Sequence, residues 1–148
     1  MSNTETVNVF KFDYRLFHTN LQGITHEESL MAPEKGGACI NWIVGHIVLC
    51  RDEIHELIGI PGICGKKYYD LFGEGSDGRS VKNPIELDKM VELYDESQKT
   101  LIETLQNLDL STDPKKLERL TFYSFHEAYH IGQIGILRRI LGKESVIR

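Results

Sequence analysis

The chain has 148 residues, of which 41% are hydrophobic, and its formal net charge is −5. This length fits a single domain over residues 1–148, and the negative charge argues against a broad nucleic-acid-binding surface. No apolar run is long enough to span a membrane, and three cysteines without CxxC spacing or a signal sequence favour a reducing compartment, so we expect a cytoplasmic protein.

The first elements are a helix and a turn. Apolar residues recur at spacings of three and four, which predicts an amphipathic helix from about residue 5 to Gln22 that ends at Gly23. The segment Thr25–Glu28 has the form of a capping box and predicts a short helical turn before Pro33.

A second helix is predicted from about Cys39 to Ile58, and its first turns are apolar nearly all round. Gly45 lies in this helix, where glycine is unfavourable, and indicates close approach of another backbone or of a bound group to the helix. His46 follows it in the most apolar part. Cys50, one turn later, either approaches the same site as His46 or packs in the core, and a small residue on a buried face favours the core. His55 lies among acidic residues, and we expect it to be solvated.

A long loop is predicted over residues 59–83, with one aromatic anchor at Tyr68–Phe72. The segment Gly73–Gly78 matches GxGxxG, but no strand precedes it, so it does not indicate a dinucleotide site.

The two remaining helices have clear start signals. Asn83 is a suitable N-cap for a third helix over about Pro84–Leu108, and Asp113 for a fourth over about Pro114–Leu141. Four amphipathic helices without a convincing strand predict an all-α four-helix bundle with a long loop between helices 2 and 3.

The fourth helix carries a polar stripe. His126 and His130 are four residues apart and Gln133 is seven beyond His126, so the three share one face. We expect this stripe to point into a core of apolar neighbours. They are Phe122, Phe125, Tyr129, Ile134 and Leu137.

Two neutral imidazoles on one face either hold a divalent metal or are core histidines bonded to carbonyl groups. His46 in the second helix is a third candidate ligand and favours the metal. The segment His126–His130 also matches the HExxH motif of zinc proteases, but Ile136 stands where the metzincin extension needs histidine, and no edge strand for a peptide is evident. Glu127 faces away from the two histidines and is interpreted as a packing or interface carboxylate.

The motifs together resemble the DinB/YfiT superfamily, whose members are four-helix bundles. The resemblance is carried by NWIVGH at Asn41–His46, by HEAYHIGQ at His126–Gln133 and by LRRILG at Leu137–Gly142, and it covers nearly the whole chain. It implies a single DinB-like domain with a metal triad of one histidine from the second helix and two from the fourth. In this sequence these positions are His46, His126 and His130.

The resemblance implies several possible activities. Relatives include metal-dependent transferases and isomerases that use low-molecular-weight thiols, and others are described as hydrolases. We therefore expect a divalent metal, zinc or nickel with manganese also compatible, that activates a thiol or water, with thiol-dependent S-transfer to a small-molecule substrate as the leading hypothesis. Gln133 and Asn41 are candidate orienting residues. The alternative is a non-catalytic metal-binding bundle, which could form a homodimer through apolar outer faces of the first and third helices.

Overall fold

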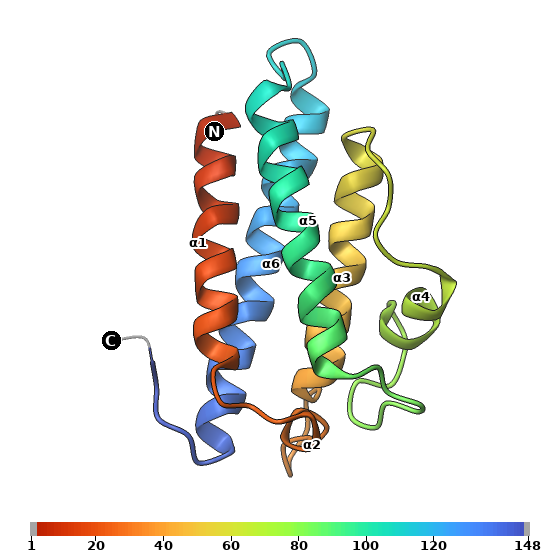
Figure 1. Cartoon of the computed structure of the whole chain (residues 1–148), viewed down its shortest axis with the longest axis vertical. Helices are drawn as coiled ribbons and strands as arrows, with labels where there is room; N and C mark the ends of the chain where they lie inside the picture. Colours follow the sequence, from red (N-terminus) through yellow and green to blue (C-terminus); the bar gives the residue numbers. More distant parts are fainter. Residues whose placement is uncertain (1–2, 147–148) are drawn as a thin grey trace.

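The computed structural model describes residues 3–146, and every regular element within them is an α-helix (Figure 1). The structure is therefore all-α, as the sequence predicts. Four helices are long: α1 (Asn3–Leu21), α3 (Ile40–Leu57), α5 (Leu87–Asn107) and α6 (Pro114–Ile140). Two are short: α2 (His26–Ser29) and α4 (Lys66–Phe72).

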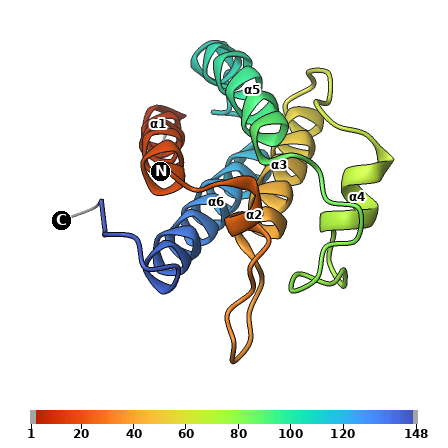
Figure 2. The ribbon, with the colours of Figure 1, turned by 60° about the horizontal axis from the view of Figure 1, so that its bottom comes forward.

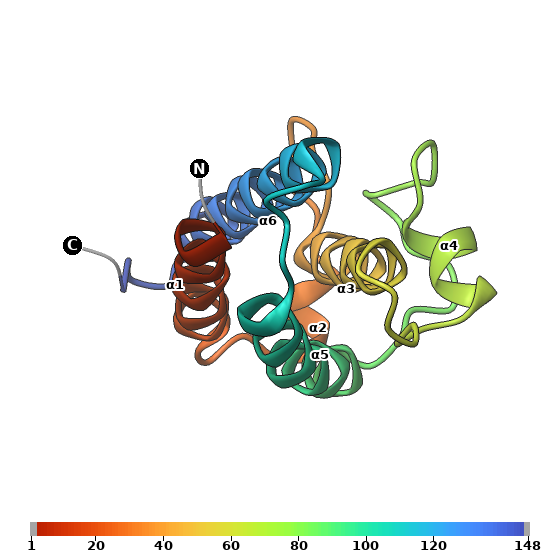
Figure 3. The same cartoon turned by 90° about the horizontal axis from the view of Figure 1, so that it is seen from above.

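The four long helices enclose one interior. Helices α1 and α3 each pack against both α5 and α6, as the view from above shows (Figure 3). The sequence colours show that α1 and α6 run in one direction and α3 and α5 in the other (Figure 1). Because α3 and α5 are parallel, the chain between them must return along the length of α3, and residues 58–86 make this crossover.

The short helices lie outside this interior. Helix α2 contacts α3 and α5, and it lies at the end of the molecule where α1 finishes and α3 begins (Figure 2). Helix α4 packs on the outer side of α3 (Figure 3). The sequence predicted only an aromatic anchor at Tyr68–Phe72, so the helical form of this segment is a correction.

Two predicted caps are confirmed. The hydroxyl group of Thr25 accepts a hydrogen bond from the backbone N–H of Glu28 at 3.1 Å. The carboxylate of Asp113 accepts one from the backbone N–H of Lys116 at 3.0 Å. Each bond satisfies a backbone donor that the first turn of a helix leaves without a partner, so these helix starts follow from local sequence.

The predicted start of the third helix is wrong. Asn83 has a φ of 51°, in the left-handed region, and α5 begins four residues later at Leu87. The backbone N–H of Leu87 donates to Nδ1 of His26 at 3.2 Å, across 61 positions of sequence. A tertiary contact therefore caps α5 in place of the local motif.

The core lies along the long helices. Core side chains from all four long helices are at most 1% exposed. They include Phe10 and Phe17 of α1, Ile47 of α3, Leu101 of α5 and Ile134 of α6. Burying one such side chain contributes about 1.5–3 kcal/mol, so this interior is the main source of stability. Among the described residues, none of the helices combines the length and the apolarity needed to cross a bilayer.

Candidate metal centre

Three imidazole rings meet where α3 packs against α6. His46 comes from α3, and His126 and His130 come from successive turns of α6. The ring centroids are 5.3 Å apart for His46 and His126, 4.8 Å for His46 and His130, and 4.4 Å for His126 and His130. The structure thus brings together the three histidines that spacing and resemblance both selected.

Two of the rings are held by acceptors behind them. Nδ1 of His46 lies 2.7 Å from the backbone oxygen of Phe72, and Nδ1 of His130 lies 2.7 Å from Oε1 of Gln133. Because these oxygens only accept, each Nδ1 donates its hydrogen, and each neutral ring keeps a lone pair on Nε2. Metal-binding histidines are commonly fixed in this way by a partner on the outer nitrogen.

The local environment keeps rings of this cluster neutral. The pKa of His130 is lowered to about 4, chiefly by burial and with smaller contributions from His46 and His126, while the hydrogen bond to Gln133 opposes the shift. Burial also lowers the pKa of His126, with a contribution from His46. At neutral pH His126 and His130 are therefore uncharged bases, the form in which imidazole binds a metal.

Cys50 is a fourth member of the cluster. Its Sγ lies 3.8 Å from Nε2 of His46 and 3.7 Å from Nδ1 of His126. One donor atom from each of these three residues lies within 4.8 Å of the other two. Burial raises the pKa of the Cys50 thiol, so without a cation it stays protonated. The sequence favoured a core position for Cys50, and the residue is indeed buried. That prediction did not include its contact with the two histidines.

Three donor separations in the cluster are close to those found around a divalent metal. Tetrahedral zinc with Zn–N near 2.0–2.1 Å and Zn–S near 2.3 Å places nitrogen pairs about 3.4 Å apart and nitrogen–sulfur pairs about 3.6 Å apart. Nε2 of His126 and Nε2 of His130 are 3.1 Å apart, and Cys50 Sγ is 3.7 and 3.8 Å from its two nitrogen neighbours. Imidazole and thiolate both suit zinc and nickel. The group His46, Cys50 and His126 is thus a possible metal-binding group in the structure.

Helix α4 positions His46 through its last residue. A Cβ atom on Gly45 would lie 2.5 Å from ring carbons of Phe72, so only glycine lets the Phe72 ring rest on α3. The same residue supplies the carbonyl that binds Nδ1 of His46. A group does approach Gly45 closely, as expected, but it is the side chain of Phe72 and not another backbone or a bound group. The Trp42 ring stacks on the His46 ring at 4.8 Å between centroids and 8° between planes.

The aromatic residues of α6 are not placed as predicted. Phe122, Phe125 and Tyr129 are 56%, 64% and 56% exposed, so they do not enclose the histidines in a core. Phe122 still stacks on His126 at 5.6 Å, and Tyr129 meets the edge of His130 at 5.2 Å. The cluster therefore lies at the border between the interior and an exposed aromatic face of α6.

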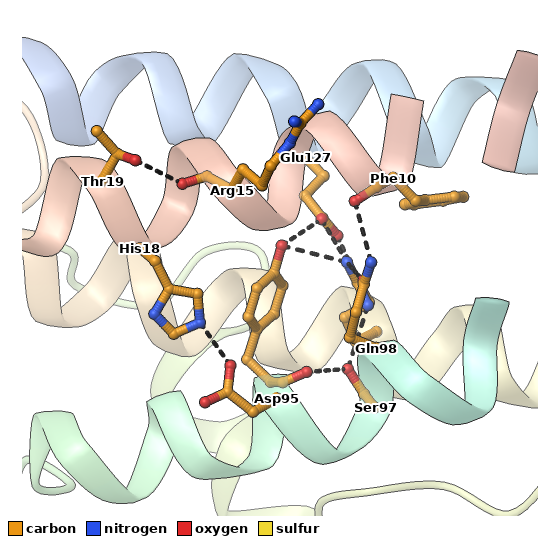
Figure 4. Close-up of polar contacts among 10 residues, drawn as sticks. Phe10, Arg15, His18, Thr19, Asp95, Ser97, Gln98 and Glu127 are labelled. Carbon is orange, nitrogen blue, oxygen red and sulfur yellow. Dashed lines mark hydrogen bonds and ion pairs between the residues drawn. The ribbon is translucent and has the colours of Figure 1, made fainter. Parts of the chain in front are cut away.

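Glu127 belongs to a separate polar network, which Figure 4 shows beside Ser97 and Gln98. Its two carboxylate oxygens accept from Nε and Nη2 of Arg51, both at 2.6 Å, and Oε1 also accepts from the hydroxyl group of Tyr94 at 2.8 Å. Arg51 and Glu127 are 0% and 2% exposed. Glu127 is thus a packing carboxylate, as predicted, and its pairing leaves it unsuited to act as the base of a zinc protease.

Arg51 is a residue that the sequence analysis missed. It lies three and seven residues beyond Val48 and Val44, so it shares their buried face of α3. A single charged residue in register with an apolar stripe was the signal that could have identified it.

Other candidate residues have structural roles. His55 is buried, and its Nδ1 binds the backbone oxygen of Pro61 at 2.8 Å, so the prediction that it is solvated is wrong. The side-chain amide of Asn41 donates to the backbone oxygen of Ile85 at 3.0 Å, which links α3 to the segment before α5. Of the two residues predicted to orient a ligand, Asn41 and Gln133, only Gln133 has a described hydrogen bond to a histidine of the cluster.

An apolar pocket of about 240 Å³ opens beside Gln133. Its walls come from the loop before α3 and from the last turns of α6. The lining residues are Pro33, Gly36, Gly37, Ala38, Ile43, Gln133, Ile136, Leu137 and Ile140. Gln133 is the only residue of this lining with a polar side chain, and it is the residue that contacts His130, so the pocket adjoins the histidine cluster.

Comparison of the chain with models of known protein families gave no match, and comparison with curated proteins gave none.

Proposed function

We propose that this protein is a metal-dependent enzyme of the DinB/YfiT type, and that its four long helices form the four-helix bundle of that superfamily. In this proposal His46, His126 and His130 hold one divalent ion, zinc or nickel, with manganese also compatible. The observation that carries the proposal is the convergence of three imidazoles. Two of them have Nδ1 committed to an acceptor, and their Nε2 atoms face another member of the cluster, Cys50 for His46 and His126 for His130.

The proposed reaction is transfer of a low-molecular-weight thiol to a small electrophile. A divalent ion on three neutral imidazoles lowers the pKa of a thiol or water in its open position and so supplies a nucleophile at neutral pH. Phe72 and Gln133 fix the orientation of two ligands, and Trp42 forms a wall against His46. The pocket beside Gln133 accommodates the apolar part of a substrate. Hydrolysis by water at the same site is the alternative reaction.

The test is an assay of metal-loaded protein with glutathione or cysteine and an aryl chloride such as chlorodinitrobenzene. The carbon–sulfur bond of the product forms as the carbon–chlorine bond breaks, chloride leaves, and the thiol proton passes to solvent. A nitrophenyl ester tests for hydrolysis. We expect turnover by the wild type and none above background for His130→Ala. His18→Ala is the matched control, since His18 bonds to Asp95 outside the cluster.

A positioning variant sharpens this assay. Gln133→Leu removes the acceptor of the His130 Nδ1 hydrogen, and the loss of such a partner typically costs about 10–100-fold in metal affinity or activity. Turnover lost with His130→Ala and reduced with Gln133→Leu supports the proposal. Protein that binds the metal but turns over neither thiol nor ester would refute the enzymatic function and leave a non-catalytic metal site.

A further inference from the structure

His126 presents both of its ring nitrogens to possible metal ligands. Nε2 lies 3.1 Å from Nε2 of His130, and Nδ1 lies 3.7 Å from Sγ of Cys50. The lone pairs of the two nitrogens of one imidazole point away from each other, so a single ion can bond to only one of them. An ion shared with His130 would therefore bind Nε2 of His126, whereas an ion shared with Cys50 would bind Nδ1.

The second set of donors has its three ligand atoms within 4.8 Å of one another. His46 and Cys50 are four residues apart on α3, so their side chains share one face. Sγ lies 3.8 Å from Nε2 of His46, close to the value of about 3.6 Å for a sulfur and a nitrogen on tetrahedral zinc. His46 can thus contribute the same nitrogen to either set.

The other two cysteines do not share this arrangement. Cys39 is buried at the start of α3, and the thiol of Cys64 lies near the carboxylate of Asp52. Among the described residues, the group of donors that could hold a metal contains Cys50 and neither of these. The contact with two imidazoles is therefore specific to Cys50.

We propose that Cys50 is a metal ligand that competes with His130, so that the ion is held either by His46, His126 and His130 or by His46, Cys50 and His126. This inference rests on the proposed metal site and adds a second bound state of the ion to it. When the ion moves to the second set, bonds form to the sulfur of Cys50 and to Nδ1 of His126. The bonds to His130 and to Nε2 of His126 break, and the thiol proton passes to solvent. His126 then bonds through Nδ1 and carries its hydrogen on Nε2.

The two sets differ in charge. The three-histidine set is neutral, whereas the second set adds one negative charge through the thiolate. Each set supplies three protein ligands and so leaves one position of a tetrahedral ion open. The two forms therefore differ in the charge at the ion and not in the number of open positions.

Cobalt(II) as the sole added metal tests this inference in the full-length protein. Thiolate bound to cobalt(II) gives a sulfur-to-metal charge-transfer band in the near ultraviolet, and imidazole alone does not. We expect this band in the wild type, its loss in both Cys50→Ser and Cys50→Ala, and its retention at undiminished intensity per bound cobalt in His130→Ala. Cys64→Ser is the matched control and keeps the band.

The outcomes separate this inference from the proposed function. Cobalt bound by the wild type without the band would overturn the role of Cys50 and leave the three-histidine site intact. A band that disappears in His130→Ala would show that the two residues ligate together, which overturns their competition. Wild-type protein that binds no cobalt would overturn both proposals.

Discussion

Two polar clusters lie side by side between α3 and α6, and they are built from consecutive residues. Cys50 and His126 belong to the histidine cluster, whereas their neighbours Arg51 and Glu127 form the buried ion pair. Successive residues of a helix point about 100° apart, so one pair of helices presents both clusters on different faces. The first cluster contains only groups with lone pairs to offer, and the second contains donors and acceptors that satisfy one another.

The ion-pair network is closed. Burial alone would lower the pKa of Arg51, but Glu127 raises it above the ordinary value, so the guanidinium group stays charged. Nη1 of Arg51 donates to Ser97, and Nη2, which also binds Glu127, is shared between Tyr94 and Gln98. A network of this kind has no vacant position for a ligand. In the histidine cluster, by contrast, none of the described hydrogen bonds goes to a charged group, and its nitrogen and sulfur atoms are donors that can bind a cation.

The largest predicted effect comes from breaking the closed network. Glu127→Gln leaves the Arg51 charge buried without its counter-charge, and we expect a loss of about 3–5 kcal/mol in the free energy of unfolding, measured by urea denaturation at pH 7. Metal binding by the folded protein should persist, because Glu127 is not in the histidine cluster.

The double variant Arg51→Met/Glu127→Leu is the control. Replacing both partners of a buried ion pair by apolar residues is often neutral or stabilising, so most of the stability should return. If Glu127→Gln lowered the free energy of unfolding by less than about 1 kcal/mol, the pair would contribute as little as a surface ion pair. That result would contradict the description of this network as closed and structurally important.

A smaller effect is predicted at the contact that positions His46. Gly45→Ala places a Cβ atom 2.5 Å from the Phe72 ring, and overpacking of this kind costs about 1–3 kcal/mol. The displacement of Phe72 should also weaken metal binding, because its carbonyl group orients His46. Urea denaturation and metal titration measure the two effects.

Gly132→Ala is the matched control in α6. No atom lies within 4 Å of a Cβ added there, and alanine in a helix interior is about 0.5–1 kcal/mol more favourable than glycine. This variant should therefore be more stable than the wild type. Equal stabilisation by Gly45→Ala would refute the close contact between Phe72 and α3.

The smallest effect concerns Asp13, a buried carboxyl group near the closed network. Its Oδ2 has no hydrogen-bond partner. Burial and the charge of Glu127 raise its pKa to about 8, and Arg51 opposes this. The folded protein thus retains a proton that the unfolded chain releases above its ordinary pKa of 3.8, so this group lowers stability as pH rises toward 8.

Asp13→Asn removes this titration while it keeps the shape of the side chain. We expect it to be more stable than the wild type by about 1 kcal/mol or more at pH 9, with a smaller difference at pH 5. Arg51, Glu127 and Tyr94 are the charged and titratable groups coupled to this network, and the variant leaves all three in place. A stability difference that does not change with pH would contradict the raised pKa.

The elements that depend on local sequence were predictable. The caps at Thr25 and Asp113 need only neighbouring residues, and the three histidines follow from helical spacing within two strongly apolar segments. The beginning of α5 was not predictable in this way, because the ring of His26 determines it from 61 positions away. Helix α4 has seven residues and depends on packing against Gly45.

The closed network and the role of Cys50 required the packing of α3 on α6. Periodicity places Arg51 and Cys50 on buried faces, but it does not show which residue of α6 each one meets. The exposed aromatic residues illustrate the same limit. Phe125 and Tyr129 are apolar and in helical register with the site, yet they lie just outside the buried arc of α6.

The most direct test of the central claim is the metal content of zinc-loaded, desalted protein by mass spectrometry, with wild type, His126→Ala and His18→Ala side by side. His126 contributes to both donor sets, so its removal should abolish binding whichever set holds the ion. We predict one zinc per chain in the wild type and in His18→Ala, and almost none in His126→Ala. Zinc retained by His126→Ala, or absent from the wild type, would contradict the assignment of the histidine cluster as a metal centre.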